Sequence, residues 1–381
     1  SYSVLNGMSQ QNWYRTIQRL QWIWRGISPI EIEEVLSRIA IFDAPRSDDK
    51  FIDTVVGYRR GNWSFEWSHQ AMIWQQKALR ETSEEAAADC WLRAANLYSI
   101  AAYPFINGDF LADQAVVLAM KAFENAMKFS SFEVKKLTFK LTGKGTTSGF
   151  LHLPKGCKGP YPTVIFCGGL DSLQSDYVNF FRRYLSPKGI AMLTVDMPSI
   201  GYSVKQKLSE NTCQLHGDIL QQLGDIPWID HTRVGVMGFR FGANIAVRLA
   251  YLYPKLIKGV VALGPLIHAF FTQAELQKKI PIMYLDVLAS RLGLLNIDEN
   301  NLRLSLSSYS LKNQGLIGRR MPVPMMSVYW KGDEISPKED SQLIARSSMD
   351  GDIVEIKEKP LYKGLEQALT KSADWIYAKL I

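Results

Sequence analysis

Residues 233–244 read Arg-Val-Gly-Val-Met-Gly-Phe-Arg-Phe-Gly-Ala-Asn, and they form the most informative pattern in the chain. The apolar run that ends at Met237 predicts a strand, and the apolar run over 241–252 predicts a helix. Between the two runs, Gly238 and Gly242 flank Arg240. Glycines at these positions indicate a turn so tight that only a hydrogen atom fits beside the strained central residue.

Predicted strands and helices alternate on both sides of this turn. Period-two runs near 134–141 and 149–153, with a turn at Lys144-Gly145 between them, predict a hairpin. Further strands are expected at 162–167, 191–195, 234–237, 259–263, 325–329 and 353–356, and helices near 177–185, 213–223, 241–252, 339–345 and 365–380. This order predicts an α/β fold whose mostly parallel sheet is covered on both faces, with ligands at the carboxyl ends of the strands.

Three further motifs follow predicted strands in a consistent order. Cys167-Gly-Gly-Leu-Asp171 follows the third strand, and residues 195–203 (Val-Asp-Met-Pro-Ser-Ile-Gly-Tyr-Ser) follow the fourth. Trp330-Lys-Gly-Asp333 follows the seventh. Together with the tight turn at 238–242, these positions match the oxyanion loop, the nucleophile elbow and the acid-bearing strand of the α/β-hydrolases.

Two members of a Ser-His-Asp triad are missing from these positions. Arg240 stands where the serine belongs, the loop at 359–363 lacks the expected histidine, and the last histidine in the chain is His268. A guanidinium cannot lose its proton in a protein, so Arg240 is neither nucleophile nor base, although it can bind and polarise an anion. A cation at a helix N-terminus opposes the helix dipole, so a negative group should face it: Asp171, Asp333 or a substrate carboxylate.

The candidate catalytic residues are therefore Asp171, Arg240 and Asp333, each with a plainer alternative. Asp171 is either a general acid/base, the partner of Arg240, or a turn-forming residue after two glycines. Asp333 is more readily an ion-pair member than a working triad acid. The plainer alternative for Arg240 is an ion pair that fills an inactive site. His268 is expected to be a satisfied core histidine. The candidates for binding substrate or stabilising an oxyanion are the backbone N–H groups at Gly169, Leu170 and Phe241.

The first 131 residues carry helical patterns and no strand signal. Apolar residues recur at helical spacing between Trp13 and Trp24, and Ser28-Pro29-Ile30-Glu31 is a capping box that starts a second helix. The aromatic segment 60–74 is expected to be irregular. Further helices are expected from 82–85 onward and at 112–128.

The change of pattern near residue 132 predicts two domains. We expect a helical, lid-like N-terminal domain over 1–131 and an α/β-hydrolase domain over 132–381, with 265–320 as a cap insertion. Seven of the 10 tryptophans lie at or before Trp91, so they are expected to form the core of the helical domain.

Composition excludes several classes of protein. The chain has 381 residues with 47% hydrophobic and 21% charged residues, which is ordinary globular usage. Its net charge of +7 is spread over scattered pairs, so no nucleic-acid surface is expected. The longest apolar stretch, over 259–271, is 13 residues, short of the ~18 that a membrane span needs. Four scattered cysteines show no metal spacing and suit a reducing cytoplasm, so we expect no metal and a cytoplasmic location.

With the turn at 238–244, the 167–171 loop and the aromatic helical region, the chain resembles the fermentation–respiration switch protein (FrsA) family of gammaproteobacteria over its whole length. In that family arginine is the usual residue at the elbow. The resemblance implies an α/β-hydrolase domain behind a helical N-terminal domain, carboxylesterase activity and no cofactor. It also implies a regulatory partner in fermentation and respiration, the unphosphorylated IIA component of the glucose phosphotransferase system. An alternative activity, pyruvate (2-oxo acid) decarboxylation, is implied for the residues that match Asp171 and Arg240.

These hypotheses differ in the chemistry that they require. Ester hydrolysis without serine and histidine needs water activated by a carboxylate such as Asp171, with backbone N–H groups for the oxyanion. Decarboxylation leaves a carbanion that normally needs an electron sink, and no candidate for that sink is visible. An inactive scaffold that only binds a partner needs no chemistry at all. We expect an esterase-type α/β-hydrolase with a regulatory partner and a small-molecule ester substrate, ahead of a 2-oxo acid decarboxylase or a binding protein.

Overall fold

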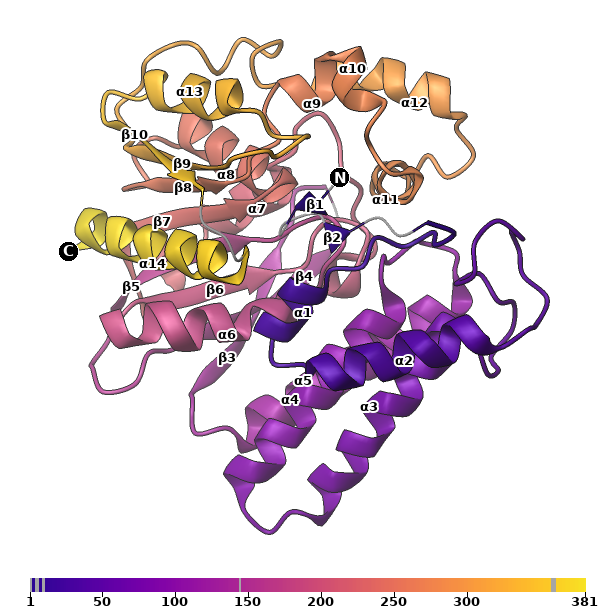
Figure 1. The fold of residues 1–381 in the computed structure, drawn as a ribbon. Coiled ribbons are helices and arrows are strands. Elements are labelled where there is room, and N and C mark those ends of the chain that lie inside the picture. The colour runs from indigo at the N-terminus through magenta and orange to yellow at the C-terminus, as the bar shows by residue number, and fades with distance from the viewer. Residues whose placement is uncertain (1, 4–6, 9–10, 144, 358–360) are drawn as a thin grey trace. The chain divides into compact units, whose positions relative to one another are not determined.

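The computed structural model describes residues 2–3, 7–8, 11–143, 145–357 and 361–381, and it contains an eight-stranded sheet (Figure 1). The strand order across the sheet is β10-β9-β8-β7-β5-β6-β4-β3. The strands are β3 (Val134–Lys140), β4 (Thr146–His152), β5 (Tyr161–Cys167), β6 (Ala191–Val195), β7 (Ile229–Phe239), β8 (Val260–Leu263), β9 (Met325–Trp330) and β10 (Gly351–Ile356).

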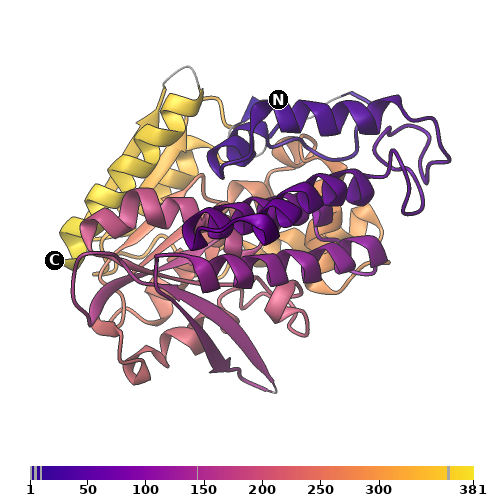
Figure 2. The same ribbon diagram turned by 90° about the horizontal axis from the view of Figure 1, so that it is seen from below.

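The sheet is parallel from β10 through β6 and antiparallel at β4 and β3, as the alternation of elements predicts. The predicted hairpin is confirmed as β3 and β4, which pair along their full lengths and project as two long arrows in Figure 2. The central strands β5 and β6 are almost wholly buried, which is why their sequences are continuous apolar runs. The fold is therefore the predicted mostly parallel α/β sheet.

Two glycines of β7 show that helices cover both faces of the sheet. A Cβ atom on Gly235 would lie 2.8 Å from a side-chain carbon of Ile376, in the helix α14 (Leu361–Leu380). A Cβ atom on Gly238 would lie 2.2 Å from the carbonyl oxygen of Gly242, in the helix α8 (Phe241–Leu252). Successive strand residues point to opposite faces, so positions three apart face opposite sides. Both glycines are needed for these helices to approach the strand closely.

The remaining helices after residue 170 include short 3-10 and π segments. They are η1 (Gln174–Tyr177), α6 (Val178–Phe180), η2 (Phe181–Leu185), η3 (Ser186–Lys188), η4 (Gly201–Ser203), α7 (Gln214–Leu220), η5 (Leu223–Asp225), α9 (Ala269–Thr272), α10 (Ala274–Gln277), α11 (Ile282–Leu292), α12 (Glu299–Ser305), η6 (Leu306–Tyr309) and α13 (Lys338–Arg346). The predicted loop at 359–363 falls partly outside the described residues, and its last three residues begin α14.

The chain forms two compact units. The first comprises residues 1–133, 171–179 and 281–290, and the second comprises 134–170, 180–280 and 291–381. The second unit holds the whole eight-stranded sheet. Two internal segments, one after β5 and one within the expected cap insertion, therefore belong to the helical unit.

The helical unit contains the predicted helices with two corrections. Its elements before residue 134 are β1 (Tyr2–Ser3), β2 (Gly7–Met8), α1 (Arg19–Trp24), α2 (Pro29–Ile41), α3 (Trp63–Arg80), α4 (Glu84–Ala102) and α5 (Phe110–Phe129). The helices that start after Ser28 and Ser83 are confirmed, and each serine side chain caps its helix. The two short strands lie where no strand signal was found. Helices α3, α4 and α5 run side by side (Figures 1 and 2).

The prediction that 60–74 is irregular is wrong. Asn62 caps α3 by accepting a hydrogen bond from the Phe65 N–H, and Trp63 and Trp67 then lie one turn apart on the buried face. The helix expected from Trp13 is also wrong in its start, because α1 begins only at Arg19. The Asp53 carboxylate accepts hydrogen bonds from the backbone N–H groups of residues 14 and 15, which holds that segment in a non-helical course.

Tryptophans form the core of the helical unit, as expected from their positions in the sequence. Trp22, Trp63 and Trp67 are at most 1% exposed, and their rings contact one another with centroids 5.6–6.3 Å apart in tilted or edge-on geometry. The ring of Tyr103 packs edge-on against Trp22. Large aromatic rings therefore form the centre of the core of this unit.

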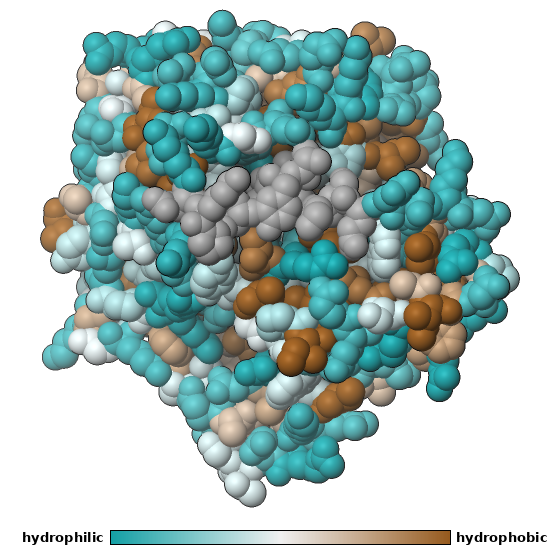
Figure 3. Space-filling view, in the orientation of Figure 1, coloured by the Kyte–Doolittle hydropathy of each residue, from teal (hydrophilic) through white to brown (hydrophobic). Residues whose placement is uncertain are grey.

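Figure 3 shows how apolar residues are distributed on one face of the surface. On the face shown in Figure 3, hydrophobic residues lie in separate patches among hydrophilic ones. Among the described residues, no helix is both long enough and apolar enough to span a membrane.

A buried histidine in α7 should make stability depend on pH. Both ring nitrogens of His216 are buried and have no hydrogen-bond partner among the described residues. Burial lowers the pKa of His216 to about 4. The unfolded chain, with an ordinary histidine pKa, binds this proton first as the pH falls. We therefore expect His216 to lower the free energy of unfolding by about 2 kcal/mol between pH 7 and pH 5.

This contribution can be isolated by urea unfolding of wild type and His216→Leu at both pH values. The variant should lose less stability on acidification than wild type. His231→Gln, at an exposed position, is the control and should behave as wild type. Equal losses in wild type and His216→Leu would contradict the assignment.

Candidate active site

The strained turn after β7 is centred on Arg240. Its backbone has φ 53° and ψ −113°, a left-handed φ that few residues other than glycine adopt. The Arg240 N–H donates to the Leu263 carbonyl (3.0 Å), and the Arg240 carbonyl accepts from the Ala243 N–H (3.1 Å). The turn is thereby fixed between the end of β8 and the first turn of α8, and it has the geometry that the glycine pattern predicts.

The two flanking glycines are both required by close backbone contacts. A Cβ atom on Gly242 would lie 2.1 Å from the Cys167 carbonyl oxygen and 2.5 Å from that of Gly168. A Cβ atom on Gly238 would lie 2.2 Å from the Gly242 carbonyl oxygen. The start of α8 therefore rests directly on the 167–171 loop, which brings the elbow and the predicted oxyanion loop together.

The side chain of Arg240 forms an ion pair with Asp333. Its Nη1 lies 2.6 Å from Asp333 Oδ2 and its Nη2 lies 3.1 Å from Asp333 Oδ1, a bidentate and charge-assisted pair. Both side chains are at most 5% exposed. Nη1 also donates to the Gly264 carbonyl (3.1 Å), and the backbone N–H of Ile335 donates to Asp333 Oδ1 (3.2 Å). Of the negative groups expected to face Arg240, Asp333 lies against it.

The 167–171 loop is held by an arginine that sequence reasoning missed. The fully buried Arg291 donates from Nε to the Leu170 carbonyl (2.9 Å) and from Nη1 to the Ser199 hydroxyl (2.9 Å). Ser199, in the motif after β6, also has a left-handed φ of 76°. Arg291 thus links the loops after β5 and β6. It lies in the expected cap insertion, where no local motif marks it.

Asp171 belongs to the helical unit. It is half-buried, and its Oδ2 accepts a hydrogen bond from Gln18 Nε2 at 3.3 Å. Burial and, second, the Asp171 charge raise the pKa of Tyr103, which places that phenol within electrostatic reach of the carboxylate. The structure therefore joins Arg240 and Asp333 in one ion pair and describes Asp171 among residues of the N-terminal helices.

His268 is satisfied by a neighbouring side chain, as expected. Its Nδ1 lies 2.6 Å from Ser310 Oγ, and its backbone N–H donates to the Asp340 carboxylate at 3.0 Å. Burial raises the pKa of Asp340 to about 6, against the opposing effect of the backbone N–H groups of 267–269. These residues brace the chain after β8. Among the residues that the structure describes, no cluster of three histidine, cysteine or acidic side chains could hold a metal ion.

The sheet order, the strained elbow after β7 and the acid after β9 together define an α/β-hydrolase. A family model described as "Esterase FrsA-like" matches residues 2–381, and the chain belongs to this family. It is 56% identical over 380 residues to "Esterase FrsA" of Photorhabdus laumondii subsp. laumondii, covering 100% of this chain and 92% of that one. It is 51% identical over 379 residues to "Esterase FrsA" of Yersinia pestis (strain Pestoides F), covering 100% and 91%.

Solved structures share the fold at low sequence identity. The crystal structure of the 2,6-dihydroxy-pseudo-oxynicotine hydrolase is similar with a TM-score of 0.76 and 17% identity, covering 95% of each chain. The structure "AbyA5 Wildtype" is similar with a TM-score of 0.69 and 19% identity, covering 96% of this chain and 99% of that one. Because both matches extend over the N-terminal helices, the similarity includes more than the sheet.

The ion pair between Arg240 and Asp333 should behave as a coupled unit in stability measurements. Asp333→Ala leaves a buried guanidinium without its carboxylate, so we expect a loss of about 3–5 kcal/mol in the free energy of unfolding. The double variant Arg240→Met with Asp333→Leu removes both charges and should recover most of that loss. Urea unfolding of the single and double variants measures both effects.

An exposed ion pair gives the matched control. Asp350→Ala removes the partner of Lys379 at 2.8 Å on the surface and should cost less than about 1 kcal/mol. If the double variant is as unstable as Asp333→Ala, the two charges do not stabilise each other as described.

Proposed function

We propose that the chain is a carboxylesterase that works without a serine nucleophile and also binds the unphosphorylated IIA component of the glucose phosphotransferase system. The observation that carries the esterase proposal is the elbow. Its strained backbone and the start of α8 are kept, while its central side chain is engaged by Asp333. Such an elbow can offer backbone N–H groups to an oxyanion but no nucleophile.

In the proposed reaction, water is the nucleophile and Asp171 is the general base. The carboxylate takes a proton from water as the oxygen attacks the ester carbonyl, and the carbonyl oxygen becomes an oxyanion. The backbone N–H groups of Leu170 and Phe241 stabilise that charge. Gly169 allows the loop to lie close to the substrate, and the positive charge of Arg240 adds to the stabilisation. Collapse of the intermediate breaks the C–O bond, and the alkoxide takes the proton from Asp171. The acid product then loses its own proton to solvent.

The alternative of 2-oxo acid decarboxylation is less well supported. In that reaction Arg240 would have to bind the substrate carboxylate, but its guanidinium already makes a bidentate pair with Asp333. Both partners are buried, so exchange of Asp333 for a substrate would leave a carboxylate unpaired in the protein interior. The carbanion left after loss of CO₂ would also need an electron sink among the chain's own groups to stabilise it.

The regulatory part of the proposal rests on the family. Membership of the FrsA-like esterases supports a partner in control of fermentation and respiration, and a cytoplasmic location would put the chain beside it. We also propose the division into a helical domain over 1–131 and a hydrolase domain over 132–381, with a cap insertion at 265–320.

Removal of the proposed base should abolish most ester turnover. We expect Asp171→Asn to lower kcat/KM for p-nitrophenyl acetate by about 10²–10⁴-fold, because general base catalysis contributes this much. Asp225→Asn, at an exposed carboxylate, is the matched control and should retain wild-type activity. Thermal unfolding of both variants checks that the fold is kept.

Three outcomes would overturn parts of this proposal. Unchanged turnover in Asp171→Asn would reject Asp171 as the base. Conversion of pyruvate to acetaldehyde by wild type, lost in Asp171→Asn, would favour the decarboxylase. Absence of wild-type turnover above background for both substrates would favour a binding protein without catalysis.

The partner proposal has a separate test. Immobilised full-length chain should retain purified unphosphorylated IIA and should release it when IIA is phosphorylated on its active-site histidine. Equal retention of both forms, or of neither, would contradict the proposal. Quantification by titration calorimetry gives the affinity ratio of the two forms.

A further inference from the structure

We propose that Gln18, at the start of the first helix, is a positioning residue for Asp171, the proposed general base. The inference deepens the proposed function and rests on it. Gln18 is 5% exposed, and its Nε2 lies 3.3 Å from Asp171 Oδ2. The two residues are 153 positions apart in sequence and lie in the same compact unit.

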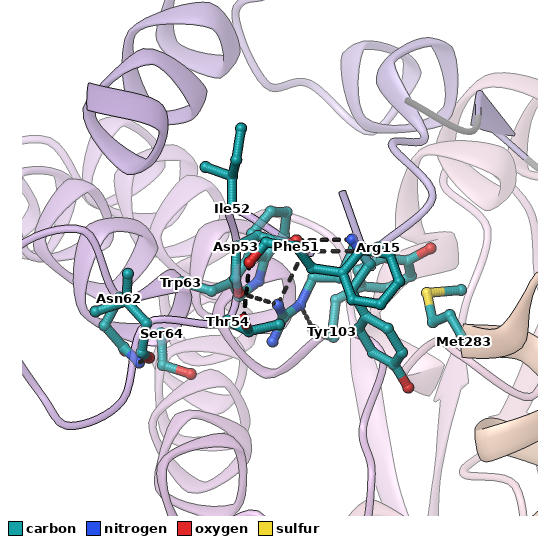
Figure 4. Close-up of polar contacts among 12 residues, drawn as sticks. Arg15, Phe51, Ile52, Asp53, Thr54, Asn62, Trp63, Ser64, Tyr103 and Met283 are labelled. Carbon is teal, nitrogen blue, oxygen red and sulfur yellow. Dashed lines mark hydrogen bonds and ion pairs between the residues drawn. The ribbon is translucent and has the colours of Figure 1, made fainter. Parts of the chain in front are cut away.

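The backbone before Gln18 is held by a clamp that consists of Arg15, Asp53, Trp63 and Tyr103, drawn in Figure 4. Arg15 Nη1 donates to the Asp53 carbonyl (2.8 Å) and lies 3.1 Å from its carboxylate, and Arg15 Nε donates to the Tyr103 carbonyl (2.9 Å). The Arg15 guanidinium also lies 4.6 Å above the ring of Trp63. Three hydrogen-bond acceptors and one aromatic face therefore hold Arg15, three positions before Gln18.

The clamp places Gln18 at the end of its non-helical segment. The Gln18 carbonyl accepts from the Trp22 N–H (3.0 Å), which begins α1, while its backbone keeps non-helical angles of φ −94° and ψ 53°. A residue that directly precedes a helix directs its side chain away from the helix axis. Here the Gln18 amide reaches the Asp171 carboxylate. If α1 began at Trp13, as its apolar spacing alone would predict, Gln18 would lie in mid-helix.

Other charges near this contact are paired within the helical unit. Tyr103 donates its hydroxyl to the Thr16 carbonyl (2.8 Å), and burial first and the Asp171 charge second raise its pKa, so it remains neutral. Arg15 is paired with Asp53, and Arg25 lies 3.4 Å from Asp176. The Gln18 amide adds a neutral donor to the Asp171 carboxylate. Such a donor favours the ionised form, which a general base needs.

Two substitutions at Gln18 test this role through the pH dependence of activity. Gln18→Met keeps the length of the side chain and removes the donor, so kcat should fall about tenfold with KM unchanged. The acid limb of the kcat/KM profile for p-nitrophenyl acetate should move to higher pH, because loss of a donor raises the pKa of the carboxyl. Gln18→Glu sets two carboxylates together and should move that limb further, by about one pH unit or more.

Gln11→Glu is the matched control, because it adds the same charge at an exposed position of the same segment. It should leave the profile unchanged. A purely structural role for Gln18 would lower the melting temperature without moving the acid limb. An acid limb that stays in place in both Gln18 variants would overturn the inference.

A second readout separates this inference from the proposed esterase chemistry. The carboxyl carbon of Asp171 can be titrated by ¹³C NMR in aspartate-labelled full-length protein and assigned by its loss in Asp171→Asn. Its midpoint should rise in Gln18→Met and rise more in Gln18→Glu, even if Asp171→Asn keeps full ester turnover. In that case the catalytic role of Asp171 fails and the Gln18 contact stands. Unchanged midpoints would reject the contact whatever the enzyme activity.

Discussion

The buried ion pair between Arg240 and Asp333 is the constraint on which the carboxyl edge of the sheet depends. A guanidinium at the N-terminus of α8 opposes the helix dipole and loses its hydration, so it is tolerated only beside a charge of opposite sign. Asp333 supplies that charge from the loop after β9, and the Gly264 carbonyl after β8 shares the same guanidinium. One side chain therefore joins the ends of β7, β8 and β9.

This pair changes what the hydrolase scaffold can do. In a Ser-His-Asp enzyme, a histidine carries protons between the acid and the nucleophile. Here the longer arginine side chain reaches the acid directly, so the elbow and the acid form a fixed pair and no proton moves between them. With arginine at its centre the elbow still makes a tight turn, because Gly238 and Gly242 allow α8 to rest on the 167–171 loop. In the proposed reaction the catalytic carboxylate comes instead from Asp171, the last residue of that loop.

Most of the strands and their order of motifs could be predicted from the sequence, because the strands between residues 134 and 356 contain short apolar or alternating runs bounded by turn residues. The helix caps at Ser28 and Ser83 were equally local signals. The failures came from long-range contacts or dense aromatic composition. Helix α1 starts late because Asp53, nearly 40 residues on, binds the backbone N–H groups of residues 14 and 15. Helix α3 was hidden by aromatic residues that periodicity alone did not resolve.

The sequence by itself determined the fold class, the tight elbow and the absence of serine and histidine from the triad positions, because these depend on residue types at short spacing. Only the tertiary structure decided that Asp333 is the acid that pairs with Arg240, that Gln18 contacts Asp171 and that Arg291 contacts Leu170. These partners lie 93 to 153 positions apart. No local pattern specifies such pairs, since they form only when the packing of distant helices and strands brings their polar groups together out of water.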